Sequence, residues 1–184
     1  MHFLRIFVVS GAVAVAMTVA ALPAVAAPTD DTAVTFAVLA GTLDIVTPET
    51  AALGSGAPGT DISGALGVVT VTDGRASADA SWDATVTSTV FQTGGGTPPE
   101  TVLASEVSYW SGPATATTGD GTFAPAQATA GAAQPLDNVV PTPAFTHDGG
   151  TGNNTAGWNP GLVVHVPLDS QGGTYSGTVT HSVA

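Results

Sequence analysis

This sequence predicts an all-β protein, an antiparallel β-sandwich of immunoglobulin-like or Greek-key type that follows a cleaved signal helix. The composition is rich in Ala, Gly, Thr and Val and poor in Leu, Glu and Lys, which disfavours long amphipathic helices. Several short segments alternate apolar and polar residues with a period of two, as half-buried strands do. Gly- and Pro-rich turns separate these segments, and none of them has helical periodicity.

The first 26 residues have the pattern of a secretory signal peptide. A short basic start, Met1 to Arg5, precedes an apolar stretch that closes at Ala24-Val25-Ala26, an A-x-A cleavage signal. We expect cleavage after Ala26 and a single mature domain, residues 27–184, that is long enough to bury a core. An uncleaved anchor helix is the alternative, which Pro23 disfavours.

The expected mature chain is strongly acidic. Without the signal, Arg75 is its only basic side chain against 14 acidic residues, and the chain has no lysine. Such a surface repels nucleic acid and anionic lipid, so we expect no nucleic-acid partner and no membrane contact after signal cleavage. Adaptation to salt is a second explanation of the acidity. Because there is no cysteine, packing must hold the exported fold.

In the N-terminal half, strands are expected at 34–46, with a break near Gly41, and at 65–73. The Gly-, Pro- and Ser-rich stretch 48–64 is expected to be a loop. Asp73-Gly74-Arg75 is expected to begin a tight turn, because Asp-Gly suits the positive φ of such a reversal.

The clearest predicted strand is 81–91. One of its faces carries Trp82, Ala84, Val86, Ser88 and Val90. This alternation predicts a half-buried antiparallel strand with Trp82 inward.

The C-terminal half is expected to contain three further strands, at 101–110, 161–167 and 173–184. The long connection after Phe123 is expected to hold one short strand around 138–140. The Gly- and Asn-rich stretch 145–159 is expected to be a loop.

Catalysis has little support in the residues. The sequence has no G-x-S-x-G elbow and no cysteine, and its acidic residues fall mostly at predicted strand ends and turns. We therefore expect a protein that is not an enzyme and has no cofactor. Paired carboxylates of the glycosidase type are the open alternative.

The histidines do not match zinc spacing, and we expect no metal site. His147-Asp148 is expected to be a polar loop tip rather than a calcium or zinc site. His165 is expected to point outward from an edge strand.

The tryptophans are the candidate ligand-binding residues. Core packing is the first interpretation for Trp82. Trp110 and Trp158 lie at predicted loop junctions. There an aromatic side chain either stacks on a sugar ring or caps the end of a sandwich.

Two stretches resemble the motifs of the WxL-domain surface proteins. VTVTDGRASADASWDATVTSTVF, from Val69 to Phe91, resembles the proximal motif region, in which a strand ending in D-x-R leads to a W-x-L strand. The C-terminal YSGTVTHSVA resembles the distal motif, Y-x-x-x-(L/I/V)-T-W-x-L, with Tyr175, Val179 and Thr180 in matching places. The mid-chain and C-terminal placement of the two motifs also resembles that family.

The sequence departs from both motifs. Ala84 stands where the proximal motif has leucine, and His181 and Val183 stand where the distal motif has tryptophan and leucine. If the two signature tryptophans form a wall-binding face, half of it is absent here. If they are core residues, His181 marks a different packing.

The resemblance implies a secreted, extracellular, non-enzymatic surface protein that associates non-covalently with cell-wall peptidoglycan. The candidate ligand-binding residues are Trp82, Trp110, Trp158, Tyr175 and His181. A structural or adhesive subunit that binds partner proteins through a sheet edge or Gly-rich loops is the second hypothesis. A carbohydrate-binding module or glycan-active enzyme is the third.

Asp73 and Arg75 are expected to form a structural corner. The planar guanidinium of Arg75 can cross-link a carboxylate and loop carbonyls. An exposed ion pair contributes only about 0–1 kcal/mol, so a measurable effect requires partial burial.

Overall fold

The computed structural model describes residues 28–184, and the predicted signal peptide lies outside them. Its strands all lie in one compact unit, residues 38–184, and residues 28–37 belong to a separate unit. The predicted all-β antiparallel sandwich is confirmed: the described residues form fourteen strands, paired antiparallel, and three 3-10 turns. The described part of the chain has no helix long and apolar enough to cross a membrane.

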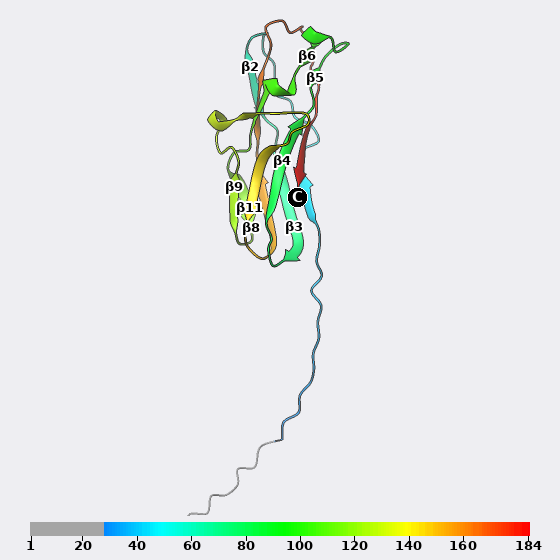
Figure 1. Cartoon of the computed structure of the whole chain (residues 1–184), viewed down its shortest axis with the longest axis vertical. Helices are drawn as coiled ribbons and strands as arrows, with labels where there is room; N and C mark the ends of the chain where they lie inside the picture. Colours follow the sequence, from blue (N-terminus) through cyan, green and yellow to red (C-terminus); the bar gives the residue numbers. More distant parts are fainter. Residues whose placement is uncertain (1–27) are drawn as a thin grey trace, which may run out of the picture. The chain divides into compact units, whose positions relative to one another are not determined.

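Three four-stranded sheets and one two-stranded sheet make up the domain (Figure 1). The first sheet has the order β1-β3-β12-β8, formed by Leu43–Val46, Val69–Ser77, Gly152–Trp158 and Ala114–Thr118. The second has the order β10-β7-β13-β2, formed by Gln134–Pro135, Val107–Trp110, Gly161–His165 and Asp61–Ala65. The third has the order β14-β4-β11-β9, formed by Val179–Val183, Trp82–Ser88, Thr142–Asp148 and Thr122–Pro125.

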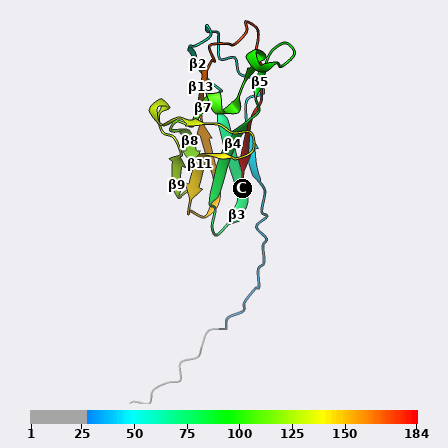
Figure 2. The same ribbon diagram turned by 45° about the horizontal axis from the view of Figure 1, so that its top comes forward.

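The two ends of the domain differ in their strands. The small β5–β6 sheet, Phe91–Gln92 with Thr101–Val102, lies at one end together with β2 (Figure 2). The connection from β3 to β4 lies at the opposite end. Between the ends, the inward faces of the three larger sheets share one hydrophobic core.

Strand β4 follows its predicted alternation. Trp82, Ala84, Val86 and Ser88 are buried, and Asp83 is exposed. The inward position predicted for Trp82 is confirmed, because its side chain is 2% exposed. β4 is a central strand between β14 and β11, so its alternate residues are buried against the opposite sheet.

The turn predicted at Asp73-Gly74-Arg75 is wrong. β3 continues through these residues to Ser77, because it has a partner on each side: Asp73 faces Leu43 of β1 and Asn154 of β12. Paired backbone on both flanks outweighs the local turn preference of Asp-Gly. The chain reverses later, after Ala76, which has a positive φ of 52°.

The strand predicted at 34–46 is only partly present, because β1 begins at Leu43. Residues 34–42 have no strand assignment, and four of their apolar side chains are 77–89% exposed: Val34, Phe36, Val38 and Leu39. Alternation alone does not make a strand when no neighbouring strand pairs with it. The predicted loop 48–64 contains most of β2.

The largest error concerns 145–159, which was predicted to be a loop. These residues lie in two strands, β11 and β12, joined by a turn in which Gly149, Gly150 and Gly152 have positive φ. Alternate residues of β12 are buried, namely Asn154, Ala156 and Trp158. The asparagine and glycine content hid this period of two, because Asn154 is a core residue with internal hydrogen bonds.

The long connection after Phe123 differs from its prediction as well. Residues 138–140 form no strand, and a two-residue strand, β10, lies slightly earlier. The sequence analysis did not predict β8 and β9. β8 is rich in threonine, and β9 is only four residues long. In 101–110 a 3-10 turn, Ala104–Glu106, separates β6 from β7.

Candidate functional site

The corner predicted at Asp73 and Arg75 is a partly buried ion pair. The Asp73 carboxylate is 0% exposed and accepts three hydrogen bonds from Arg75: from its backbone N–H and Nε, both at 2.9 Å, and from Nη2 at 2.8 Å. Nη2 also donates to the backbone oxygen of Ser81 at 2.8 Å. The guanidinium therefore ties β3 to the residue before β4, across the connection between the two strands.

A polar network extends this corner into the core. Asn154 Nδ2 donates to Asp73 Oδ2 at 3.4 Å and to the Ala80 oxygen at 3.3 Å, and Asn154 Oδ1 accepts from Trp82 Nε1 at 2.8 Å. The network thus runs from Arg75 through Asp73 and Asn154 to Trp82. A satisfied buried network of this kind fixes the positions of its members.

Electrostatics in the corner favours the ionised carboxylate. The hydrogen bond from the Arg75 side chain holds the pKa of Asp73 below its ordinary value, although burial acts in the opposite direction. Arg75 has a raised pKa for the reciprocal reason, the hydrogen bond to Asp73. Both groups are therefore charged at neutral pH.

A row of aromatic rings crosses the core beside this network. Phe123 stacks on His147 with centroids 4.3 Å apart, and Phe145 stacks on Trp158 at 4.8 Å. Trp82 lies between the two pairs, 5.8 Å from His147 and 6.3 Å from Phe145. Trp82 and Trp158 are therefore core residues, and neither indole presents a face to an external ligand.

His181, at the distal-motif position of tryptophan, is an inward residue of β14. Its Nε2 lies 3.1 Å from the Tyr109 hydroxyl, which accepts a hydrogen bond from Trp158 Nε1 at 3.1 Å. Burial lowers the pKa of His181 to about 4 and raises that of Tyr109. Both side chains are therefore neutral at pH 7. His181 packs here as an aromatic neighbour of Tyr109 and Trp158.

Tyr175, the first residue of the distal motif, connects two loops through hydrogen bonds. Its hydroxyl donates to backbone oxygens, at 3.0 Å from Pro99 and 2.9 Å from Gln171. The side chain is partly buried. Tyr175 packs against the hydrophobic core, but no described ring pair joins it to the aromatic row.

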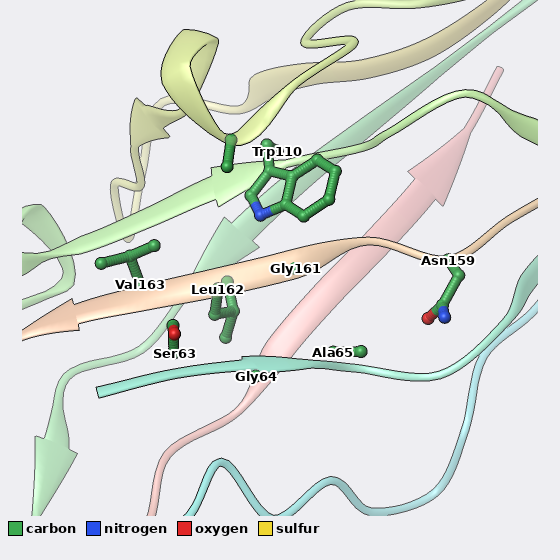
Figure 3. Close-up of a pocket in the computed structure, with 9 residues that line it drawn as sticks. Ser63, Gly64, Ala65, Trp110, Asn159, Gly161, Leu162 and Val163 are labelled. Atoms are coloured by element: carbon green, nitrogen blue, oxygen red, sulfur yellow. The ribbon is translucent and has the colours of Figure 1, made fainter. Parts of the chain in front are cut away.

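Trp110 is the one predicted tryptophan that reaches the surface. In β7, Val107 and Tyr109 are buried, whereas Ser108 and Trp110 point to the other side of the sheet and are partly exposed. Trp110 lines a cleft of about 330 Å³ together with residues of β2 and β13 (Figure 3). The indole N–H groups of Trp82 and Trp158 have partners, and that of Trp110 has none among residues 28–184.

The strand register explains the position of the Trp110 indole. Trp110 faces Gly161 of β13, which faces Ala65 of β2, so the two neighbours in its row are small. The indole lies across Gly161, and a methyl group at that position would overlap it. The next row contributes Ser63 and Val163, and Asn159 lies at the end of the cleft (Figure 3).

The cleft combines groups of the kind that contact sugars, namely an aromatic ring and uncharged hydrogen-bonding side chains. None of its lining residues is charged, and it combines one aromatic ring with the amide of Asn159 and the hydroxyl of Ser63. An aromatic face packs against the apolar face of a ring, while amide and hydroxyl groups bind hydroxyls. We call this site, formed by Trp110, Gly161, Asn159 and Ser63, the Trp110 cleft.

The predicted ligand-binding residues are thus divided among three places, and Tyr175, between the loops at Pro99 and Gln171, is one of them. The structure brings Trp82, Trp158 and His181 together inside the core, and it places Trp110 alone on the outer face of the second sheet. Sequence reasoning missed Gly161 and Asn159. The alternation of Tyr109 and Trp110 against Gly161 and Leu162 was the available signal, but it requires knowing that β7 and β13 pair.

Of the two histidines, His147 differs from its prediction and His165 keeps its expected exposure. His147 is not a loop tip: it is 1% exposed on β11, with its nitrogens 2.8 Å from the backbone oxygens of Ala80 and Asp120. His165 is exposed as expected, although β13 is an inner strand, and it lies 2.8 Å from Asp61. Among residues 28–184 there is no group of three or more potential metal-ligating side chains.

Comparison with known proteins does not assign the chain to a family. No protein-family model matches the chain, and no curated protein matches it.

Proposed function

We propose that the protein is a secreted, non-enzymatic surface protein that associates non-covalently with cell-wall peptidoglycan, and that the Trp110 cleft carries the contact. The observation that supports this function is the partly exposed indole of Trp110, which lies flat over Gly161 beside an amide and a hydroxyl. The resemblance of the Trp82 and Tyr175 stretches to the WxL motifs supports the same reading.

The negative charge of the protein also favours an uncharged ligand such as a sugar. The chain has 14 acidic residues, so an anionic wall polymer would be repelled at distances within a Debye length, about 8 Å in physiological salt. An uncharged cleft can bind the neutral sugars of a glycan strand without that penalty. Binding of this kind is insensitive to ionic strength.

Co-sedimentation with purified cell walls tests the function. The full chain is expected to pellet with the walls at low and high salt, and Trp110→Ala is expected to weaken binding about tenfold through loss of the stacking surface. Leu103→Ala, which removes a 54%-exposed apolar side chain elsewhere, is the matched control and should bind as the wild type does. Circular dichroism checks that each variant is folded.

Two results would contradict this function. Wild-type protein that stays in the supernatant at every salt concentration, with and without divalent cations, rules out wall binding. A folded Trp110→Ala variant that pellets like the wild type moves the contact away from the Trp110 cleft.

A structural subunit is the second candidate, and one observation favours it. Val34, Phe36 and Val38 alternate along a segment without a strand partner, and these side chains and that of Leu39 are 77–89% exposed. Such a segment suits addition to a free sheet edge of a partner protein. Concentration-dependent assembly that Phe36→Asp abolishes would support this candidate, and a monomer at all concentrations would exclude self-assembly.

A further inference from the structure

The second sheet has a cavity on the face opposite to the Trp110 cleft. The cavity has a volume of about 780 Å³, within the usual range for small-molecule sites. Its wall includes Ile62 of β2 and Leu162 and Val164 of β13, whose neighbours Ser63 and Val163 face the Trp110 cleft. Two connecting segments, 47–58 and 170–178, complete the wall.

The strand side of the cavity wall is apolar, the connecting segments add Ser, Thr and Gly residues, and the wall is almost free of charge. Aliphatic and aromatic side chains from four sheets contribute to it, among them Val69, Phe91, Val102 and Val179. Glu49 is the only charged residue that lines it. A hydrocarbon body gains by entering such a space, whereas a carboxylate or phosphate would lose its hydration without meeting a cation.

Two polar atoms in this wall have no partner. Of the three buried side-chain nitrogen or oxygen atoms without a hydrogen bond among the described residues, two, His181 Nδ1 and Ser170 Oγ, belong to side chains that line the cavity. Buried polar atoms are rarely left unpaired in a native structure, and a missing ligand or water is a usual reason. Their shared location indicates that an occupant supplies the partners.

The hydrogen bonds around His181 define what the occupant must offer. The Tyr109 hydroxyl accepts from Trp158 Nε1, so its own hydrogen needs an acceptor, and we assign that role to His181 Nε2, its other described partner at 3.1 Å. A neutral imidazole that accepts at Nε2 carries its hydrogen on Nδ1. His181 Nδ1 is therefore a buried donor, and it needs an acceptor oxygen.

From these observations we infer that the cavity binds a neutral amphiphile, a molecule with a hydrocarbon body and an uncharged acceptor oxygen such as that of a fatty-acyl ester or amide. The hydrocarbon packs against Ile62, Val164 and Phe91. The oxygen accepts from His181 Nδ1, and the Ser170 hydroxyl is a second polar group for the same end or for a bound water. This site is independent of the Trp110 cleft.

Three probes of matched length test the inference on the full chain: methyl decanoate, decanoate and undecane. Calorimetry is expected to show binding of the ester, about tenfold weaker binding of the alkane, which lacks the oxygen, and at least about tenfold weaker binding of the carboxylate. The ¹⁵N resonance of His181 Nδ1 should shift with the ester and remain unchanged with the alkane.

Variants locate the binding site. Val164→Phe fills the cavity and should abolish ester binding, whereas Val163→Phe makes the same change on the opposite face and should leave it intact. His181→Phe keeps an aromatic ring but removes Nδ1, so it should remove the preference for ester over alkane. Should His181→Phe fail to fold, the Nδ1 resonance of the wild type still decides the role of the nitrogen.

The inference is overturned if no probe binds, which would leave a cavity filled by water only. It is also overturned if Val164→Phe binds the ester as the wild type does, or if ester and alkane bind equally with no change at Nδ1. Wall binding by Trp110 is measured separately, so failure of one proposal leaves the other standing.

Discussion

One end of the domain is filled and the other is hollow. Toward the β3–β4 connection, a row of rings packs together, and the polar network holds the Trp82 indole in the middle of this row; the rings are those of Phe123, His147, Trp82, Phe145 and Trp158. Toward β5 and β6, aliphatic side chains surround about 780 Å³ of space. The same sandwich thus has close aromatic packing in one half and open space in the other.

Trp82→Ala disrupts the packing of the filled end and should cause the largest loss of stability among these variants. It removes a fully packed indole and leaves the Asn154 amide oxygen without its donor, so we expect a loss of about 3–5 kcal/mol in the free energy of unfolding. Urea titration followed by circular dichroism measures it. A loss no larger than that of Trp110→Ala would show that the aromatic row does not carry the stability.

Acid should lower the free energy of unfolding through protonation of His181, which lies between the two ends. Its pKa is about 4 in the folded protein against about 6.5 when unfolded, so between these values the unfolded state binds the additional proton. The free energy of unfolding should therefore fall as the pH falls from 6.5 to 4, by about 3 kcal/mol from this group. Denaturant titrations at a series of pH values follow the change.

His181→Phe provides the control for that pH dependence. It should flatten the curve between pH 6.5 and 4, while the contribution of Asp73 stays. Because the folded-state pKa of Asp73 is lowered, its contribution is fully present above the ordinary carboxyl pKa and is lost only as the pH falls through the folded value. An unchanged slope in His181→Phe would assign the acid sensitivity to another group.

Arg75→Ala should destabilise the filled end less, by about 2 kcal/mol. It leaves the Asp73 carboxylate buried without its charged partner, but Arg75 is 35% exposed, which moderates the loss. Adding Asp73→Asn should recover part of the stability, because the unpaired charge is then removed. A melting temperature that does not change in Arg75→Ala would contradict a structural role for the corner.

Two matched Val→Ala substitutions, one at each end, compare how much side-chain packing stabilises the two ends. Val86→Ala, at a side chain 1% exposed, should cost about 2 kcal/mol, because it opens a space in packed surroundings. Val164→Ala should cost less than about 1 kcal/mol, because this partly buried side chain already borders the cavity. Equal losses, measured by urea titration, would mean that the hollow is closed in solution.

The fold class and strand β4 were predictable from the sequence, whereas the rest of the filled end and both sites were not. The alternation in 81–91 is a local property, and it correctly predicted β4 and the burial of Trp82. Asn154 and the glycines around it disguised β12, because an asparagine in the core depends on partners distant in the sequence, Trp82 and Asp73. The Trp110 cleft and the cavity both depend on which strands pair, information that no single segment contains.

A structural corner at Asp73 and Arg75 was expected, and its surroundings were not. A turn was predicted where β3 in fact continues between two neighbours. Likewise His181 was recognised as a departure from the distal motif, but its contact with Tyr109 joins residues far apart in the chain.

The isolation of Arg75 limits where a trypsin-like protease can attack the domain. Because residues 27–184 contain no lysine and no other arginine, the bond after Arg75 is the only one in this range that such a protease can cut. That bond lies within β3, and the side chain that the protease must grip is held by Asp73 and Ser81. Cleavage therefore requires the filled end to open, so the rate of a single cut reports how often the domain unfolds.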